Sequence, residues 1–283
     1  MQIIRGRHAG FCMGVALALK KLDHTIEEFE NSRKIYTLGP IIHNRQVTDR
    51  YKNLGVVPIE NIDRLQKGDV VVIRAHGVPK ELEEDLQKKG VTIIDATCPK
   101  VKKAQKLIEE YSKKYTLLLY GEKDHPEVKG LISRTNGNFL VFSSKNELKN
   151  LALDVSTKYF LAAQTTQDKE EFLEIIEYLK NNIRQDFPIL HTICTATRQR
   201  QQEAIEIAKK VDLMIVIGGF HSGNTRRLFQ VVKNTNTPCI HIETYKDLPK
   251  DIIKNKEVIG ITAGASTPDY IIDEVEQFLL TAS

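Results

Sequence analysis

The feature that most constrains the fold is a series of short apolar runs, each of which ends in a small polar cluster. The runs are KIYTL, DVVVIRA, VTIID, YTLLLY, YFLAA, DLMIVI and EVIGIT, and polar stretches such as GPIIHN, HGV and GGFHSGN follow them. Continuous Val, Ile and Leu runs that alternate with helical patterns are typical of buried parallel strands in an α/β protein. We therefore expect the polar clusters at the carboxyl ends of the strands, where open α/β sheets bind ligands.

Three of the helical patterns begin directly after a cysteine. Apolar residues recur every three or four positions after Cys12, after Cys98 and after Cys194, which predicts an amphipathic helix at each place. Pro99 suits the first position of the second of these helices. The architecture thus repeats at a period of about 90 residues.

This repeat predicts three similar α/β units with parallel sheets, in a pseudo-threefold (trefoil) arrangement with the cysteines converging at its centre. The predicted units are residues 13–97, 98–193 and 194–283, and we expect the segment 1–12 to pack on the third.

The four cysteines are too far apart for a CxxC motif or a disulfide framework, so each is either a core residue or a ligand. Cys239, in TPCIHIE, has no helix start behind it, and we expect it in the core. Cys12, Cys98 and Cys194 each precede a helix N-terminus, whose partial positive charge favours the thiolate that binds metal. Three thiolates can hold zinc with a fourth ligand, or three irons of a [4Fe–4S] cluster whose fourth iron stays open.

The polar clusters contain the candidate ligand-binding residues. An imidazole N–H, a hydroxyl or an amide near a helix start donates well to phosphate oxygens. The candidates of this kind are His43, His76, His125, Ser222, Asn224 and Ser266.

A single carboxylate, Glu127 in HPEVKG, follows His125 by two residues. Beside a Lewis-acid iron, one accessible carboxyl group is what protonation of a leaving hydroxyl requires. Thr165 and Thr166, in AAQTT, would either extend a proton relay or cap the helix that begins near Asp168.

Composition excludes several classes of protein. No stretch approaches the about 20 apolar residues of a membrane helix, and residues 1–20 lack the pattern of a secretory signal, so we expect a cytoplasmic protein that does not contact membranes. The 41 basic and 37 acidic residues leave a net charge of +4, too small to indicate a nucleic-acid partner.

Taken together and in order, the motifs closely resemble those of the 4-hydroxy-3-methylbut-2-enyl diphosphate reductase family, the iron–sulfur enzymes of the last step of the non-mevalonate isoprenoid pathway. The resemblance runs from about Phe11 to Ile272. The motifs that carry it are GFCMGV, HNRQV, AHGV, DATCPKV, HPEVKG, QTT, ICTATRQRQ, GGFHSGNTRRL and TAGASTPDYII.

The resemblance implies a trefoil around a [4Fe–4S] cluster held by Cys12, Cys98 and Cys194, a cluster that can be isolated as [3Fe–4S]. The implied reaction uses two electrons and two protons to remove the hydroxyl of an allylic diphosphate as water, giving isopentenyl and dimethylallyl diphosphates, with the apical iron on the substrate hydroxyl. Glu127, Thr165 and His125 correspond to the catalytic residues. The implied substrate-binding residues are His43, His76, His125, Thr165, Ser222, Gly223, Asn224 and Ser266.

The implied partners are the small-molecule substrate and an electron donor of the ferredoxin or flavodoxin type, and we expect a monomer or a weak dimer. Three positions depart from the family pattern. Ala18 stands where an Arg is common, and we expect it to alter only a surface contact. Gly223 replaces a Ser, so its backbone N–H or the side chain of His221, where the family has Asn, would take over that phosphate contact.

Two other functions fit parts of the sequence. A zinc-stabilised α/β module could bind a phosphate-bearing ligand without redox chemistry. A metal-dependent phosphohydrolase could use His43, His76 and His125, although such enzymes recruit several carboxylates and only Asp95 and Asp124 accompany Glu127.

Overall fold

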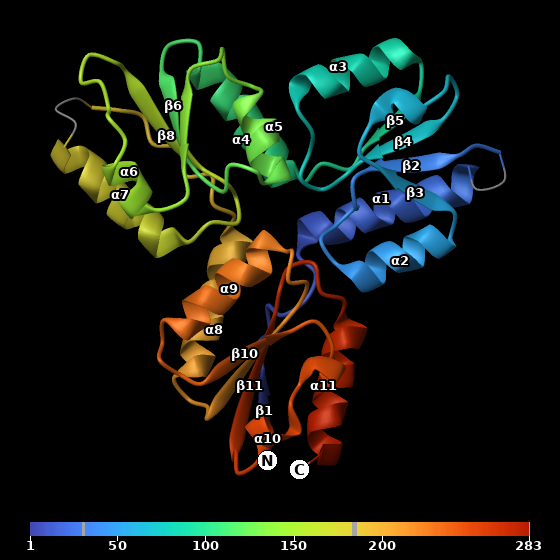
Figure 1. Ribbon diagram of the computed structural model, residues 1–283, viewed down its shortest axis with the longest axis vertical. Coiled ribbons are helices and arrows are strands. Elements are labelled where there is room, and N and C mark those ends of the chain that lie inside the picture. The colour runs from blue at the N-terminus through green and yellow to red at the C-terminus, as the bar shows by residue number, and fades with distance from the viewer. Residues whose placement is uncertain (30–31, 183–185, 283) are drawn as a thin grey trace. The chain divides into compact units, whose positions relative to one another are not determined.

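The computed structural model contains three separate parallel sheets with helices packed against them, which confirms the predicted α/β class (Figure 1). It describes residues 1–29, 32–182 and 186–282. Within these ranges, no helix combines the length and the apolar character that crossing a membrane requires.

The first sheet has the strand order β3-β2-β4-β5, and all its pairs are parallel. Its two central strands are fully buried, which explains the continuous apolar runs. The chain leaves β2 toward β3 on one side and β4 toward β5 on the other. The elements in this part of the chain are α1 (Met13–Phe29), β2 (Ile35–Leu38), α2 (Arg45–Asn53), β3 (Val56–Ile59), η1 (Ile62–Arg64), β4 (Val70–Ile73), α3 (Lys80–Lys89) and β5 (Thr92–Asp95).

The second sheet has the order β7-β6-β8 and is covered on both faces. Along β6, Leu117 and Leu119 pack with α4 and α5, whereas Leu118 and Tyr120 pack with α7. This alternation follows from the two-residue period of a strand. The elements are α4 (Pro99–Tyr111), β6 (Thr116–Tyr120), α5 (Pro126–Ile132), β7 (Phe139–Phe142), α6 (Lys145–Lys149), β8 (Tyr159–Ala163) and α7 (Lys169–Asn182).

The third sheet has the order β1-β11-β9-β10 and is built in the same way, with β1 added in parallel beside β11. Met214 and Val216 of β9 face α8 and α9, whereas Leu213, Ile215 and Ile217 face α11 on the other side (Figure 1). The elements are β1 (Gln2–Arg5), α8 (Thr195–Ala208), β9 (Leu213–Ile217), α9 (Gly223–Lys233), β10 (Cys239–Ile242), η2 (Tyr245–Asp247), α10 (Lys250–Ile253), β11 (Val258–Ala263) and α11 (Asp269–Ala282).

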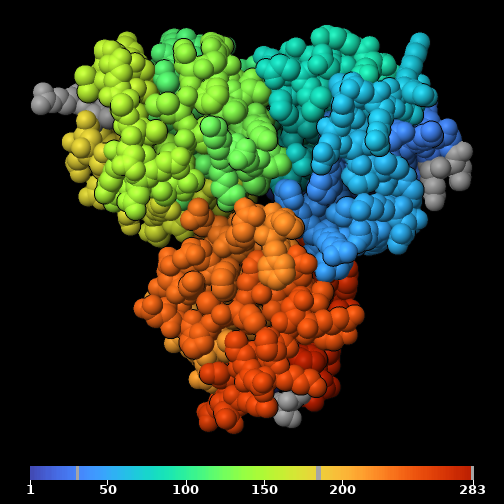
Figure 2. Space-filling model, viewed as in Figure 1, coloured from blue at the N-terminus to red at the C-terminus, as the bar shows by residue number. Residues whose placement is uncertain are grey.

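The chain divides into two compact bodies. The terminal body comprises Met1–Ala16, Ile42–Tyr51 and Thr195–Ser283, and the central body comprises Leu17–Ile41 and Lys52–Cys194. The stretch that follows Cys194 is coloured orange to red in Figure 2 and contributes most of the buried residues around the third sheet. The central body contains the first two sheets, and the boundaries of the three predicted units stay a prediction.

One expectation about the first helix is wrong. Ala18 is fully buried in α1 and does not lie at the surface. It precedes the buried Leu22 by four positions, so both residues lie on the apolar stripe of the helix. The replacement of the family's common arginine by Ala18 therefore changes the packing of the core and not a surface contact.

Candidate functional site

Cys12, Cys98 and Cys194 share one local geometry, although they lie in different parts of the chain. Each immediately precedes a helix, α1, α4 or α8. The N–H of each cysteine donates to the carbonyl two residues beyond the end of a buried strand: Cys12 to Ala265 at 3.2 Å, Cys98 to Ala75 at 2.9 Å and Cys194 to Thr165 at 2.9 Å. The three thiols therefore occupy equivalent places, at the carboxyl edge of a sheet and the N-terminus of a helix.

The same three cysteines are half-buried and form no disulfide, as ligands require. Cys239 differs from them because it lies within strand β10 and packs against the core under α8 and α9. Burial raises the pKa of the Cys239 thiol, which disfavours the thiolate. Its surroundings are those of a structural residue.

The segment before Cys12 is held by two charged side chains of α8. Arg200 is buried and donates from Nε to the His8 carbonyl at 2.7 Å and from Nη2 to the Gly10 carbonyl at 2.8 Å. Glu203 accepts two backbone N–H groups of this segment, from Arg7 and His8, each at 2.9 Å. Sequence reasoning missed this clamp, because a helical Arg and Glu are usually solvated.

Glu127 lies in the first turn of α5 and is almost completely buried. Its carboxylate accepts the backbone N–H of Thr165 at 2.6 Å and the Thr165 hydroxyl at 3.0 Å. Thr165 therefore contacts the carboxyl group, whereas Asp168 caps α7 by accepting the Glu171 N–H at 2.7 Å. Helix capping, one of the two roles considered for Thr165 and Thr166, is therefore performed by Asp168.

Burial raises the pKa of Glu127 from 4.5 to about 7, because a buried carboxylate loses its hydration. The two hydrogen bonds from Thr165 favour the ionised form and offset only part of this effect. The carboxyl group therefore exchanges its proton near neutral pH, as a general acid requires.

The raised pKa has a consequence for stability. The folded protein binds the Glu127 proton more tightly than the unfolded chain, so the stabilisation it contributes below pH 4.5 is lost as the pH rises to about 7. We expect this contribution to be about 3 kcal/mol. Denaturant unfolding at pH 5 and pH 8 should show a larger fall in the free energy of unfolding for the wild type than for Glu127→Gln, and equal falls would contradict the assignment.

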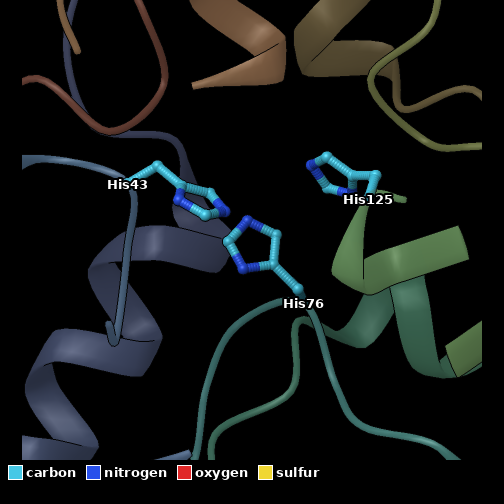
Figure 3. Close-up of side chains that lie close together, drawn as sticks. All are labelled: His43, His76 and His125. Carbon is cyan, nitrogen blue, oxygen red and sulfur yellow. The ribbon is translucent and has the colours of Figure 1, made fainter. Parts of the chain in front are cut away.

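His125 caps the helix that carries Glu127. Its Nδ1 accepts the Glu127 backbone N–H at 3.1 Å, so the neutral ring carries its proton on Nε2. The ring of His76 approaches it edge-on, with 5.4 Å between centroids (Figure 3). The central body thus brings together His76, the neighbouring residues His125 and Glu127, and Thr165, which come from three separate parts of the sequence.

The terminal body holds the other predicted ligands. His43 precedes α2 (Figure 3), and its carbonyl accepts the Ser266 hydroxyl at 3.2 Å. The Ser266 hydroxyl also lies 3.5 Å from that of Ser222, which caps α9 by accepting the Thr225 N–H at 3.3 Å. His43, Ser222 and Ser266 therefore form one connected group.

The remaining predicted residues of this group lie at the start of α9. Gly223 is the first residue of the helix, where backbone N–H groups have no intrahelical acceptor. The Asn224 Nδ2 is buried and has no hydrogen-bond partner among the described residues. His221 is exposed, so the Gly223 N–H is the better substitute for the missing serine hydroxyl.

Gly219 controls the place of His43. A Cβ at this position would lie 2.7 Å from the His43 carbonyl oxygen, too close for any side chain. We expect Gly219→Ala to displace the His43 backbone, to cost about 1–3 kcal/mol of stability and to weaken the binding of inorganic diphosphate. Calorimetry and thermal unfolding measure both effects.

Gly68→Ala is the matched control, because Gly68 has a φ of 95° and open space around its missing Cβ. It should cost stability through backbone strain and leave the affinity for diphosphate unchanged. Equal affinities for Gly219→Ala and the wild type would show that the close approach has no part in the site.

The chain matches the model of a family described as LytB protein over residues 3–280. Among curated proteins, a 4-hydroxy-3-methylbut-2-enyl diphosphate reductase of Nitratidesulfovibrio vulgaris (strain DSM 19637 / Miyazaki F) is 51% identical over 280 residues, which are 99% of each chain. A reductase of the same name from Aquifex aeolicus (strain VF5) is 41% identical over 98% of this chain and 95% of its own.

Two solved structures are also similar. The E-1-hydroxy-2-methyl-but-2-enyl-4-diphosphate reductase of Plasmodium falciparum superposes with a TM-score of 0.92 at 29% identity, over 99% of this chain and 87% of that one. A structure of (E)-4-hydroxy-3-methyl-but-2-enyl diphosphate reductase, described as the terminal enzyme of the non-mevalonate pathway, gives a TM-score of 0.72 at 40% identity, over 99% of this chain and 100% of that one.

Proposed function

Because the chain belongs to the LytB protein family of 4-hydroxy-3-methylbut-2-enyl diphosphate reductases, we propose that it removes the hydroxyl group of (E)-4-hydroxy-3-methylbut-2-enyl diphosphate as water. Two electrons and two protons enter for each substrate. The carbon–oxygen bond of the alcohol breaks, and one carbon–hydrogen bond forms on the allyl fragment. The products are isopentenyl and dimethylallyl diphosphates.

Cys12, Cys98 and Cys194 would hold a [4Fe–4S] cluster, which can lose one iron to become [3Fe–4S]. The donor set fits such a group, because three half-buried thiols lie at equivalent strand edges and each has a helix N-terminus behind it. When bound, the cluster supplies electrons and an iron that has no protein ligand.

The observation that carries the proposal is the double role of Thr165. Its N–H and hydroxyl hold the buried carboxyl group of Glu127, and its carbonyl accepts the N–H of Cys194. The proton source and one ligand of the cluster are therefore fixed to the same residue. With a pKa of about 7, Glu127 gives its proton to the departing hydroxyl, and Thr165 orients that hydroxyl.

The diphosphate would be bound by neutral donors. The central body contributes the imidazoles of His76 and His125, and the neutral ring of His125 carries its proton on Nε2. The terminal body contributes His43, Ser222, Gly223, Asn224 and Ser266. The buried Nδ2 of Asn224, which lacks a partner among the described residues, supports this set because a phosphate oxygen would satisfy it.

The remaining predictions concern the cellular setting. We propose a ferredoxin- or flavodoxin-type electron donor, a cytoplasmic location and a monomer or weak dimer. Neither a membrane nor a nucleic acid takes part.

An anaerobic assay tests the function. Protein loaded with iron and sulfide, supplied with a chemically reduced viologen and the alcohol substrate, should oxidise two equivalents of viologen for each substrate and release both products. The control is isopentenyl diphosphate, which has no hydroxyl group and should not oxidise the viologen. Cluster-loaded protein that leaves the alcohol unchanged would refute the proposal.

A further inference from the structure

Arg74 is the first residue after strand β4, at the carboxyl edge of the first sheet. In the order β3-β2-β4-β5, the chain winds outward from β2 on one side and from β4 on the other, so the topological switch point lies between these two strands. Crevices at such switch points are where open α/β sheets bind ligands. The backbone of Arg74 therefore lies at the position in this sheet that is best suited to binding a ligand.

The guanidinium of Arg74 reaches across this switch point to the end of β2. Its Nη1 lies 2.6 Å from the place where a Cβ of Gly39 would be, and Gly39 has a φ of 70°. Gly39 is the first residue after β2. A Cβ at Gly39 would crowd the guanidinium, and the positive φ independently favours glycine here, so the cation lies against the end of β2.

The charge of Arg74 is not compensated within the described part of the chain. Its Nε is buried and has no hydrogen-bond partner there, and its guanidinium forms no ion pair with a described carboxylate. Other arginines differ: Arg200 donates to two backbone carbonyls, and Arg134 lies 2.8 Å from a carboxylate oxygen of Glu83. A largely buried cation without an anion is costly, which indicates that its anion comes from outside the chain.

We propose that Arg74 binds the diphosphate group of the substrate and supplies the positive charge that the histidine, serine and asparagine donors lack. This inference rests on the proposed function. His76 follows Arg74 by two residues, so both belong to the same loop beyond β4. A guanidinium suits this role because it stays charged and can donate two parallel hydrogen bonds to phosphate oxygens.

Arg74→Gln tests the inference in the cluster-loaded enzyme. Calorimetry with inorganic diphosphate should give a Kd about 10–100-fold higher than that of the wild type, and the KM for the alcohol substrate should rise by a similar factor. The kcat should change by less than about threefold, because a charge that binds the ground state and the transition state equally acts on KM. Arg74→Lys should recover part of the affinity, because it restores the charge without the paired donors.

Arg33→Gln is the matched control. Arg33 is exposed near the opposite, amino end of β2, and its removal changes the net charge by the same amount. Its Kd for diphosphate and its KM should equal those of the wild type. An Arg74→Gln protein with unchanged Kd and KM would overturn the inference, as would a loss of affinity equally large in Arg33→Gln.

The outcome separates this inference from the function on which it rests. A wild type that reduces the alcohol while Arg74→Gln keeps its Kd and KM refutes the role of Arg74 alone. A wild type that binds diphosphate through Arg74 but does not reduce the alcohol refutes the function and leaves the anion site standing.

Discussion

Glu127→Gln is expected to lower kcat by at least about 100-fold while the protein keeps its iron and sulfide. The amide has nearly the same shape as the carboxyl group and can still accept the Thr165 N–H, but it cannot release a proton to the departing hydroxyl. Steady-state kinetics together with iron analysis of the same sample measure both quantities. In the wild type, kcat should fall as the pH rises through about 7, because the acid form of Glu127 is then lost.

Asp124→Asn is the control for this prediction, because Asp124 is an exposed carboxylate three residues away. It should keep the wild-type rate. The kcat of Thr165→Val should lie between those of Glu127→Gln and Asp124→Asn, since this change removes the hydroxyl that contacts Glu127 and retains the backbone N–H. A Glu127→Gln enzyme that turns over at the wild-type rate with a full cluster would remove Glu127 from its proposed role.

Replacing any one of Cys12, Cys98 and Cys194 by serine should cost the cluster and, with it, at least about 100-fold in activity. Loss of an outer-shell partner already costs 10–100-fold in many metal sites, and loss of a thiolate removes a direct ligand. Iron and sulfide analysis, visible absorption and the anaerobic assay should change together in all three variants. The equivalent hydrogen bonds of the three cysteines imply effects of similar size.

Cys239→Ser is the matched control, since this thiol lies within β10 and packs against the core under α8 and α9. Its sheet also contains β1, the strand that comes before Cys12 in the chain. It should keep its iron and activity and lose only some stability. Full iron content and activity in a serine variant of any one of the other three cysteines would contradict the ligand set.

The fold was largely predictable because its signal is local. Buried parallel strands leave uninterrupted apolar runs, and the helices after Cys98 and Cys194 show a clear period. Ala18 shows where this reasoning failed: a small residue on a helix has no hydrophobic signature of its own, so only its distance of four from Leu22 indicated burial.

The site was predictable only as a set of residue types. Histidines and serines at strand ends indicated a phosphate ligand, but nothing local indicated that Thr165 would hold Glu127, which lies 38 residues earlier. Arg200 and Glu203 were missed for the same reason, since their partners lie at least 190 residues away. The double glycine of GGF was a usable signal, because Gly219 permits the close approach of His43.

The central claim is that three distant cysteines hold one iron–sulfur cluster. The most direct test is metal and sulfide analysis of the anaerobically purified protein. The account predicts a brown protein with about three to four irons and about four sulfides per chain. A colourless protein that holds zinc and no iron would contradict it.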